Sequence, residues 1–168
     1  MTFHVNRNEV PEAGLGSKGG AMETRLVYGK NMSMMYANRP ENYHSKPHAH
    51  NSEQLNYVIS GEIWIFIEDE AMLLTPGDFN RIPELEIHWS KVESGPCVML
   101  EAHCPAYVAD EELAGKGMEK AIGMFGPDEE EIPVEASMNI WAAESYAEHE
   151  AELIKAYRTS VSTDREGS

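Results

Sequence analysis

Short apolar segments separated by turn residues recur along the chain from residue 24 to residue 105. Leu55–Ile59 and Ile63–Ile67 are two of them, and the turns include Ser60-Gly61 and Pro76-Gly77-Asp78. No run with helical spacing interrupts these segments. The pattern therefore favours an all-β sandwich or barrel over a fold of alternating strands and helices.

The chain divides into three parts around this β region. Residues 1–23 contain four glycines within seven positions and are expected to form a flexible arm. Residues 24–114 are expected to form the barrel, and residues 115–168 an acidic C-terminal extension. Apolar residues in the extension recur at about 100° per residue, which predicts a helix over about 142–157. We expect this helix to pack on the barrel or on a second subunit.

Composition excludes several classes of partner. The 168 residues fit one domain, and 29 Asp and Glu against 13 Lys and Arg give a formal net charge of −16. Nucleic acid and anionic membrane surfaces both require a basic footprint, so neither is an expected partner. No apolar run is long enough to span a bilayer, and the first residues lack the apolar core of a signal peptide. With only Cys97 and Cys104, the chain reads as a cytoplasmic protein without a disulfide framework.

Three histidines and a glutamine stand at positions typical of a metal site. His48 and His50 are two residues apart, so their side chains share one face of an extended strand, and Gln54 keeps that parity. His88 follows the turn at residues 76–78, near the expected start of a return strand. Imidazole suits Zn, Fe, Ni and Cu. A His-x-His pair can equally be a surface feature or a hydrogen-bonded core pair, and Glu53 could replace Gln54 if the strand bulges.

These residues lie within a longer pattern, His48-x-His50-x3-Gln54-x6-Gly61 followed by Pro76-Gly77-Asp78-x3-Ile82-Pro83-x4-His88. The pattern resembles the two signature motifs of the cupin superfamily. Asn42 stands where the first motif usually has glycine; asparagine tolerates the left-handed conformation such a turn requires. The resemblance implies a small jelly-roll barrel, the double-stranded β-helix of RmlC-like cupins. It also implies a divalent metal ion (Fe, Mn, Ni or Zn) held by His48, His50, Gln54 and His88.

Gln54 occupies a position where cupins commonly have glutamate. A neutral amide oxygen leaves the ion with nearly its full charge, which makes it a stronger Lewis acid. This arrangement is similar to that of small cupins related to the pectin-degradation protein that linearises unsaturated uronates, and to cupin-type hydroxynitrile lyases. The resemblance implies a lyase or isomerase acting at a carbonyl or hydroxyl carbon of a small metabolite.

The catalytic and pocket residues follow from strand parity and from the same resemblance. The uronate-linearising cupins carry an acid and an arginine after the last histidine; here the acid is Glu101, but Tyr107 replaces the arginine, which argues against a uronate substrate. Glu101 is the expected general base, and His103 its partner or an alternative acid/base. Asn56, Tyr107 and Trp64 are the expected pocket residues. Alternating aromatic residues such as Trp64 are also typical of a core.

Two other functions remain open at this stage. One is a non-haem Fe(II) dioxygenase that cleaves an enol, a diketone or an aromatic substrate. The other is a non-catalytic domain that binds a small molecule. In all three cases the expected partner is a small molecule, and the resemblance implies a homodimer built on one sheet face. Dependence on oxygen would separate the first two functions.

Overall fold

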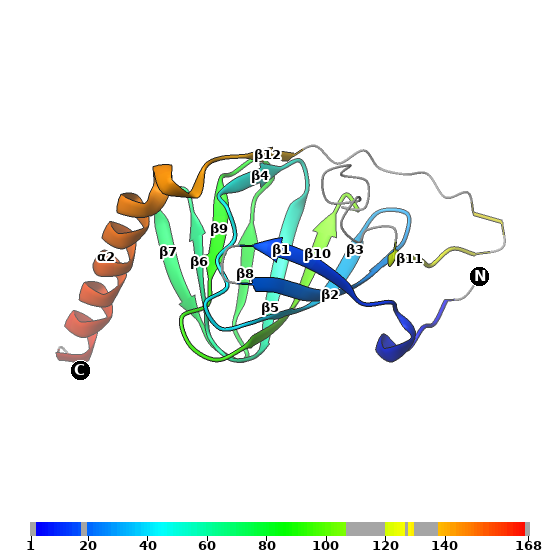
Figure 1. Cartoon of the computed structure of the whole chain (residues 1–168), viewed down its shortest axis with the longest axis horizontal. Helices are drawn as coiled ribbons and strands as arrows, with labels where there is room; N and C mark the ends of the chain where they lie inside the picture. The colour runs from blue at the N-terminus through cyan, green and yellow to red at the C-terminus, as the bar shows by residue number, and fades with distance from the viewer. Residues whose placement is uncertain (1–2, 18–19, 107–119, 127, 130–137, 167–168) are drawn as a thin grey trace.

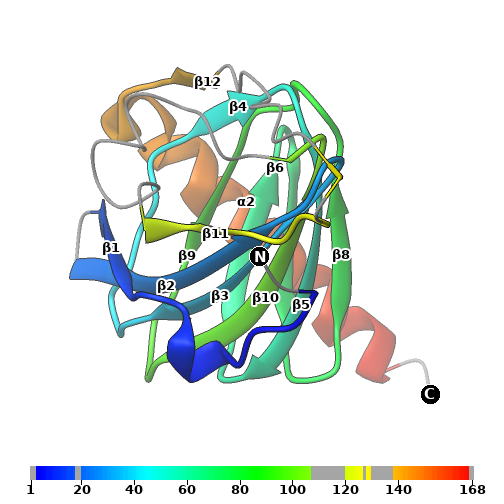
Figure 2. The ribbon, with the colours of Figure 1, turned by 90° about the vertical axis from the view of Figure 1, so that its right-hand side faces the viewer.

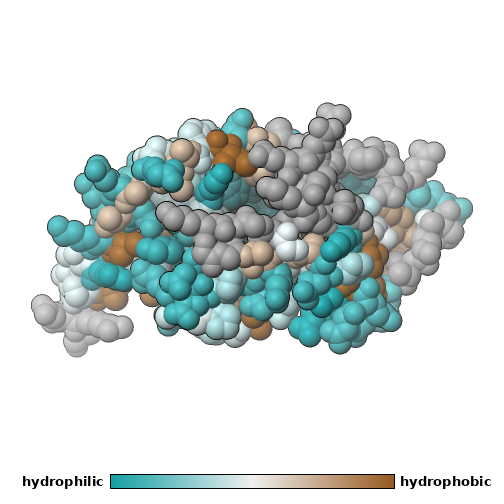
Figure 3. All heavy atoms as spheres, in the orientation of Figure 1, coloured by the Kyte–Doolittle hydropathy of each residue, from teal (hydrophilic) through white to brown (hydrophobic). Residues whose placement is uncertain are grey.

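The computed structural model of the chain describes residues 3–17, 20–106, 120–126, 128–129 and 138–166. Two antiparallel sheets face each other and enclose the core, and one long helix covers the outside of the smaller sheet (Figure 1). No helix in the described ranges is both long and apolar enough to cross a membrane. The face shown in Figure 3 is largely hydrophilic, with small separate hydrophobic areas.

The larger sheet has seven strands in the order β1-β2-β3-β10-β5-β8, with β11 paired to β2. Its strands are β1 (Ala13–Ser17), β2 (Gly20–Tyr28), β3 (Ser33–Arg39), β5 (Glu53–Ser60), β8 (Phe79–Ile82), β10 (Cys97–Cys104) and β11 (Ile122–Gly123). All pairings are antiparallel except that of β11 with β2. The sheet crosses the front of the molecule in Figure 2, and the helix lies behind it.

The smaller sheet has five strands in the order β12-β4-β9-β6-β7. Its strands are β4 (His48–His50), β6 (Ile63–Ile67), β7 (Glu70–Leu74), β9 (His88–Lys91) and β12 (Met138–Ile140). Short 3₁₀ turns occur at Arg7–Glu9 and Ala143–Tyr146, and the second leads directly into helix α2 (Ala147–Glu166). Two facing antiparallel sheets and one C-terminal helix are the jelly-roll architecture that the sequence predicts, so the fold-class prediction is confirmed.

Strand β6 is buried on both faces because it lies between two separate apolar clusters. Ile63 and Ile65 point into the barrel, where they pack in the main core with Val58 and Met99. The alternate residues of β6 point to the other side of the sheet, where a second cluster forms beneath α2. This second cluster consists of Trp64, Phe66, Trp89 and Ile154, with Tyr146, Leu153 and Tyr157 packed around it.

Two tight turns require unusual backbone conformations at the positions that the motif marks. Asn42 has φ = 63°, so asparagine does adopt the left-handed conformation at the usual glycine position. Gly61 has φ = 78° between β5 and β6, and a Cβ atom there would lie 2.2 Å from the carbonyl oxygen of Pro96. Only glycine fits this close approach without displacing the backbone.

The N-terminal segment differs from the predicted flexible arm. Within residues 1–23, β1 pairs with β2 along its whole length, and Val10, Ala13 and Met22 are buried. The glycine-rich composition indicates turns, but it does not reveal that the flanking apolar residues alternate toward the core. The larger sheet therefore begins at Ala13, before the expected barrel boundary.

The C-terminal helix also differs from its predicted limits. The apolar stripe is found where expected, since Ile154 is buried and Tyr157 packs beside it. The α-helix nevertheless begins at Ala147, after the 3₁₀ turn, and continues to Glu166. From Arg158 to Thr163 the helix is mostly polar and exposed, so apolar spacing gives little signal there. The hydroxyl of Thr163 donates to the carbonyl of Thr159 one turn back.

Candidate metal centre

The predicted ligands come from both sheets and meet at one end of the barrel. His48 and His50 lie on β4, and His88 lies on β9, where it is directly opposite His48. Gln54 lies on β5, opposite His103 of β10. Strand parity holds for all of them, because the alternate residues Ala49 and Leu55 point elsewhere.

The three imidazole rings lie close enough to share one ion. One ring nitrogen from each of His48, His50 and His88 falls within a group whose members are all within 4.8 Å of one another. Ring centroids are 4.2 Å apart for His48 and His88, and 4.7 Å apart for His50 and His88. His50 and His88 are buried, and His48 is half-buried. The geometry brings the predicted histidine ligands together; that they bind metal stays a prediction.

Backbone carbonyls favour the same tautomer in each of these histidines. Nδ1 of His48 donates to the carbonyl of Lys46 at 2.7 Å, and Nδ1 of His50 donates to that of Ser52 at 2.8 Å. Nδ1 of His88 donates to the carbonyl of Glu86 at 2.9 Å. A carbonyl can only accept, so Nδ1 carries the hydrogen and Nε2 keeps its lone pair. The lone pairs are thus on the nitrogens that can coordinate a metal.

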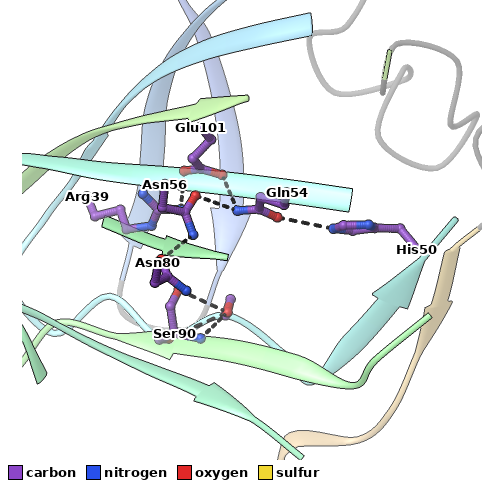
Figure 4. A network of polar contacts seen from close by, with 8 residues as sticks. Arg39, His50, Gln54, Asn56, Asn80, Ser90 and Glu101 are labelled. Atoms are coloured by element: carbon purple, nitrogen blue, oxygen red, sulfur yellow. Dashed lines mark hydrogen bonds and ion pairs between the residues drawn. The ribbon is translucent and has the colours of Figure 1, made fainter. Parts of the chain in front are cut away.

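Gln54 is held with its carbonyl oxygen toward the histidines (Figure 4). Its amide nitrogen donates to Asn56 Oδ1 at 2.8 Å and to Glu101 Oε2 at 3.2 Å. Asn56 cannot reverse this polarity, because its own amide nitrogen donates to Asn80 Oδ1 at 2.9 Å. A flipped Gln54 would face two acceptors with its oxygen, so its orientation is determined by the network.

This network brings the amide oxygen of Gln54 to the histidine group. Gln54 Oε1 lies 3.2 Å from Nε2 of His50, a contact that a proton on Nε2 or a bound cation can fill. Nε2 of His88 is buried and has no hydrogen-bond partner among the described residues. Imidazole nitrogens that converge beside an amide oxygen suit a bound cation. The donor set therefore fits a divalent metal ion.

Burial keeps the histidines neutral. Desolvation lowers the pKa of His48 to about 4 and that of His50 below its ordinary value. The pKa of His88 falls well below its ordinary value, first through burial and then through its histidine neighbours. Neutral imidazole is the form that binds metals, so these rings are ready to coordinate at neutral pH.

Glu101 is held by two partners, and its predicted role as general base stays a prediction. It is buried, with Oε1 ion-paired to the guanidinium of Arg39 and Oε2 accepting from Gln54. Burial of the carboxylate is matched by burial of its partner, whose side chain is 6% exposed. Both oxygens are engaged in orienting other groups, so the geometry favours Glu101 as a support for Gln54.

His103 is the remaining titratable side chain beside the three histidines. Its ring centroid lies 5.5 Å from that of His50, and the residue is 5% exposed. Burial, followed by the repulsion of His50 and His48, lowers its pKa to about 3. Glu101 and His103 share the inner face of β10, as parity predicts. His103 contacts the ring of His50 directly, whereas Glu101 is connected to His50 through Gln54.

Two of the three predicted pocket residues, Asn56 and Trp64, do not lie together. Asn56 is buried in the barrel and belongs to the network that orients Gln54. Trp64 packs with Tyr157 of α2 on the outer side of the sheet, away from the histidine group, so the structure does not place it beside the predicted ligands. Strand alternation explains this outcome, since Ile63 and Ile65 already occupy the inner face. Tyr107 lies outside the described residues.

The alternative ligand Glu53 lies on the outer face of β5 and pairs with Arg81, away from the histidine group. Outside the barrel, His44 donates from Nε2 to Glu150 of α2 at 2.7 Å.

Arg39 is the buried functional residue that sequence reasoning missed. It follows Met35 and Ala37 on the inner face of β3, and its guanidinium reaches Glu101. Alternation along β3 is the signal that could have placed it inside. The dipeptide Arg39-Pro40 reads as a turn, and this hid the alternation.

Comparison with known proteins identifies the barrel. The profile of the family described as "Cupin domain" matches residues 36–103, from β3 to the end of β10. This chain carries a cupin domain. The match includes both histidine-bearing strands, β4 and β9, whereas β12 and α2 lie C-terminal to it.

Solved structures support the same fold. A RmlC-like cupin from Shewanella frigidimarina superposes with a TM-score of 0.56 at 16% identity, covering 65% of this chain and 93% of that one. KdgF from Halomonas sp. gives 0.56 at 18% identity, covering 67% and 99%. The polyketide cyclase RemF from Streptomyces resistomycificus gives 0.54 at 20% identity, covering 62% and 80%. No curated protein matches the chain. At these identities the similarity is one of fold.

Proposed function

We propose that this cupin is a metal-dependent enzyme that acts on a small oxygenated metabolite by lyase or isomerase chemistry. His48, His50, His88 and Gln54 would hold a divalent ion. The observation that carries the proposal is the convergence of one ring nitrogen each from His48, His50 and His88 within 4.8 Å of one another, with Gln54 Oε1 3.2 Å from Nε2 of His50. Imidazole nitrogens and an amide oxygen are ligands that a divalent cation would share.

The ligand set is entirely neutral. No carboxylate oxygen joins the histidine group within the described part of the chain. A divalent ion held there keeps nearly its full charge and would polarise a carbonyl or hydroxyl oxygen as a Lewis acid. Three-histidine centres also serve iron dioxygenases, so the oxygen dependence of turnover, and not the ligand set, separates the two functions.

His103 is the residue that we assign to proton transfer. Its neutral ring offers an acceptor beside His50 and is excluded from bulk water. A negative charge developing on a substrate beside it would favour the imidazolium form, because opposite charges raise the pKa of a histidine. Glu101 does not take this role, since Arg39 and Gln54 occupy its two oxygens.

The substrate class follows from the charges in the barrel. Glu101 and Arg39 cancel, so a bound ion would leave a net positive interior. A neutral or carboxylate-bearing molecule is favoured there. The net charge of −16 does not prevent this, because salt screens distant surface charges over about 8 Å.

The test is a turnover screen of protein loaded separately with Mn, Ni, Zn or Fe(II). Small keto and hydroxy acids are supplied with and without oxygen. We expect turnover that requires metal and is the same under anaerobic conditions. His103→Gln should retain the metal and lose most of the turnover, by about 100-fold or more, as expected for removal of a general acid or base.

His4→Gln is the matched control, because His4 is exposed in the N-terminal segment, before the first strand of the barrel. Its turnover should equal that of the unaltered protein. Turnover that consumes oxygen and requires Fe(II) would instead assign the dioxygenase function. Metal-bound protein without turnover on any substrate class would favour the non-catalytic function.

A further inference from the structure

The segment that follows the cupin match is built into the histidine-bearing edge of the smaller sheet. Strand β12 pairs with β4, with Ile140 opposite His48 and Met138 opposite His50. The backbone N–H of Trp141 donates to the carbonyl of Pro47 at 2.9 Å. Strand β12 and Trp141 therefore hold β4, the strand that supplies two of the three histidines.

One carboxylate from α2 connects both flanks of the centre. Glu150 is 8% exposed, and its Oε2 accepts from Trp89 Nε1 at 2.8 Å and from His44 Nε2 at 2.7 Å. Its Oε1 lies 3.3 Å from the ammonium of Lys91. Trp89 is the neighbour of His88 on β9, and His44 precedes β4 by a few residues.

The two flanks also contact each other. His44 forms a β-bridge with Lys91, and the N–H of Ser90 donates to Ser45 Oγ at 2.8 Å. Glu150 closes this arrangement from outside the barrel, while His88 points inward from the same strand. Successive side chains of a strand point to opposite faces, so a shift of Trp89 moves the backbone that carries His88.

Close packing holds the side chain of Trp89 in place. It is 1% exposed, stacks on Phe66 with ring centroids 4.9 Å apart, and meets Tyr146 edge to face at 5.2 Å. A charge-assisted hydrogen bond to a buried donor is stronger than one between neutral groups. Glu150 thus contacts a side chain with little freedom to adjust.

We propose that Glu150 is a positioning residue of the metal centre, fixing β4 and β9 relative to each other through His44 and Trp89. It thereby sets the spacing of His48, His50 and His88 and the affinity of the centre for a divalent ion. The inference rests on the proposed metal-dependent function. It gives α2 a role in the centre although its apolar residues pack on the outer side of the smaller sheet.

The experiment measures Co²⁺ binding to the full chain by competition titration, together with the visible absorption of the bound ion. Glu150→Ala should raise the dissociation constant by about tenfold or more, as is typical for loss of a group that orients ligands. Its absorption spectrum should also shift. Glu150→Gln should give a smaller rise, because the amide oxygen still accepts from Trp89.

Glu93→Gln is the matched control. Glu93 also contacts Lys91 and pairs with Arg158 of α2, but its contacts do not include His44 or Trp89. Its dissociation constant and spectrum should equal those of the unaltered protein. A folded Glu150→Ala protein with unaltered affinity and spectrum would overturn the proposal.

Two further readouts keep the outcomes distinct. If the unaltered protein binds no Co²⁺, the proposed function fails, and hydrogen exchange then tests the positioning role directly. Amides of β4 and β9 should exchange faster in Glu150→Ala than in Glu93→Gln, and equal rates would refute the role.

If Glu150→Ala does not fold, Trp89→Phe replaces it as the test, because it removes the indole N–H and keeps a stacked ring. A Co²⁺ affinity unchanged from that of the unaltered protein would overturn the proposal.

Discussion

Glu101 and Arg39 form an ion pair at the centre of the barrel, where neither group reaches water. Their side chains are 5% and 6% exposed. Removing two charges from water is costly, and their mutual attraction compensates only when hydrogen bonds complete the pair. Gln54 supplies one of these bonds. The pair therefore couples the stability of the barrel to the orientation of a candidate metal ligand.

Glu101→Gln should destabilise the protein by about 3–5 kcal/mol, because it leaves the charge of Arg39 buried without a partner. The new amide would also present N–H groups to Arg39 or Gln54, which are both donors. Urea unfolding measures the change.

The control for this substitution is Glu53→Gln, which breaks the exposed pair with Arg81 on the outer face of the same sheet. The expected loss is less than about 1 kcal/mol. Equal losses in the two variants would show that the buried pair is not the stabilising element.

The ligand positions could be predicted from the sequence because strand alternation and spacing fix them. His48, His50 and Gln54 depend only on local parity, and His88 follows from the turn before it. The partners of Glu101 could not be predicted in this way. Arg39 lies on β3, far from Glu101 in the sequence, and the two side chains come together only in the folded barrel.

Strand β6 shows, at the scale of an element, why the sequence did not assign Trp64 to one face of its sheet. All positions from Ile63 to Phe66 are apolar and buried, so alternation does not distinguish the barrel face from the helix face. The distinction arises when α2 covers the outer side. The sequence predicts the helix as far as Tyr157, where its apolar residues pack on the sheet. It does not predict the continuation from Arg158, where exposed polar residues follow.

The turn between β5 and β6 provides a test at this scale. Gly61→Ala should lower the free energy of unfolding by more than about 2 kcal/mol, since a positive φ alone costs about 1–2 kcal/mol for a residue with Cβ. The contact at 2.2 Å with the Pro96 oxygen adds to this cost.

Gly95→Ala is the matched comparison in chemical denaturation. Gly95 has φ = 65°, but a Cβ there meets nothing within 4 Å among the described residues. It should show only the conformational cost. If both variants lose the same stability, the close approach of Pro96 has no energetic importance.

At the scale of the whole molecule, the buried histidines make folding sensitive to acid. In the metal-free protein, His103 has a pKa of about 3 and His48 a pKa of about 4, against about 6.5 in an unfolded chain. Between these values the unfolded chain binds more protons. Stability therefore rises with pH from about 3 to 6.5 and is lost as the pH falls through this window.

Removal of one such histidine should reduce this dependence. Chelator-treated His103→Gln should lose less stability than the unaltered protein when the pH is lowered from 7 to 4, as measured by unfolding in urea at each pH. Both proteins share the same surface charges, so the difference isolates the histidine. Parallel pH profiles would contradict the burial of a neutral His103.

The central claim is that three imidazoles and one amide oxygen form a single metal site. Elemental analysis of the protein after loading with Zn²⁺ or Co²⁺ and removal of free ion tests it most directly. We expect one ion per chain in the unaltered protein and almost none in His88→Ala, with both proteins folded. Absence of bound metal from the unaltered protein, or equal metal content in both, would contradict the claim.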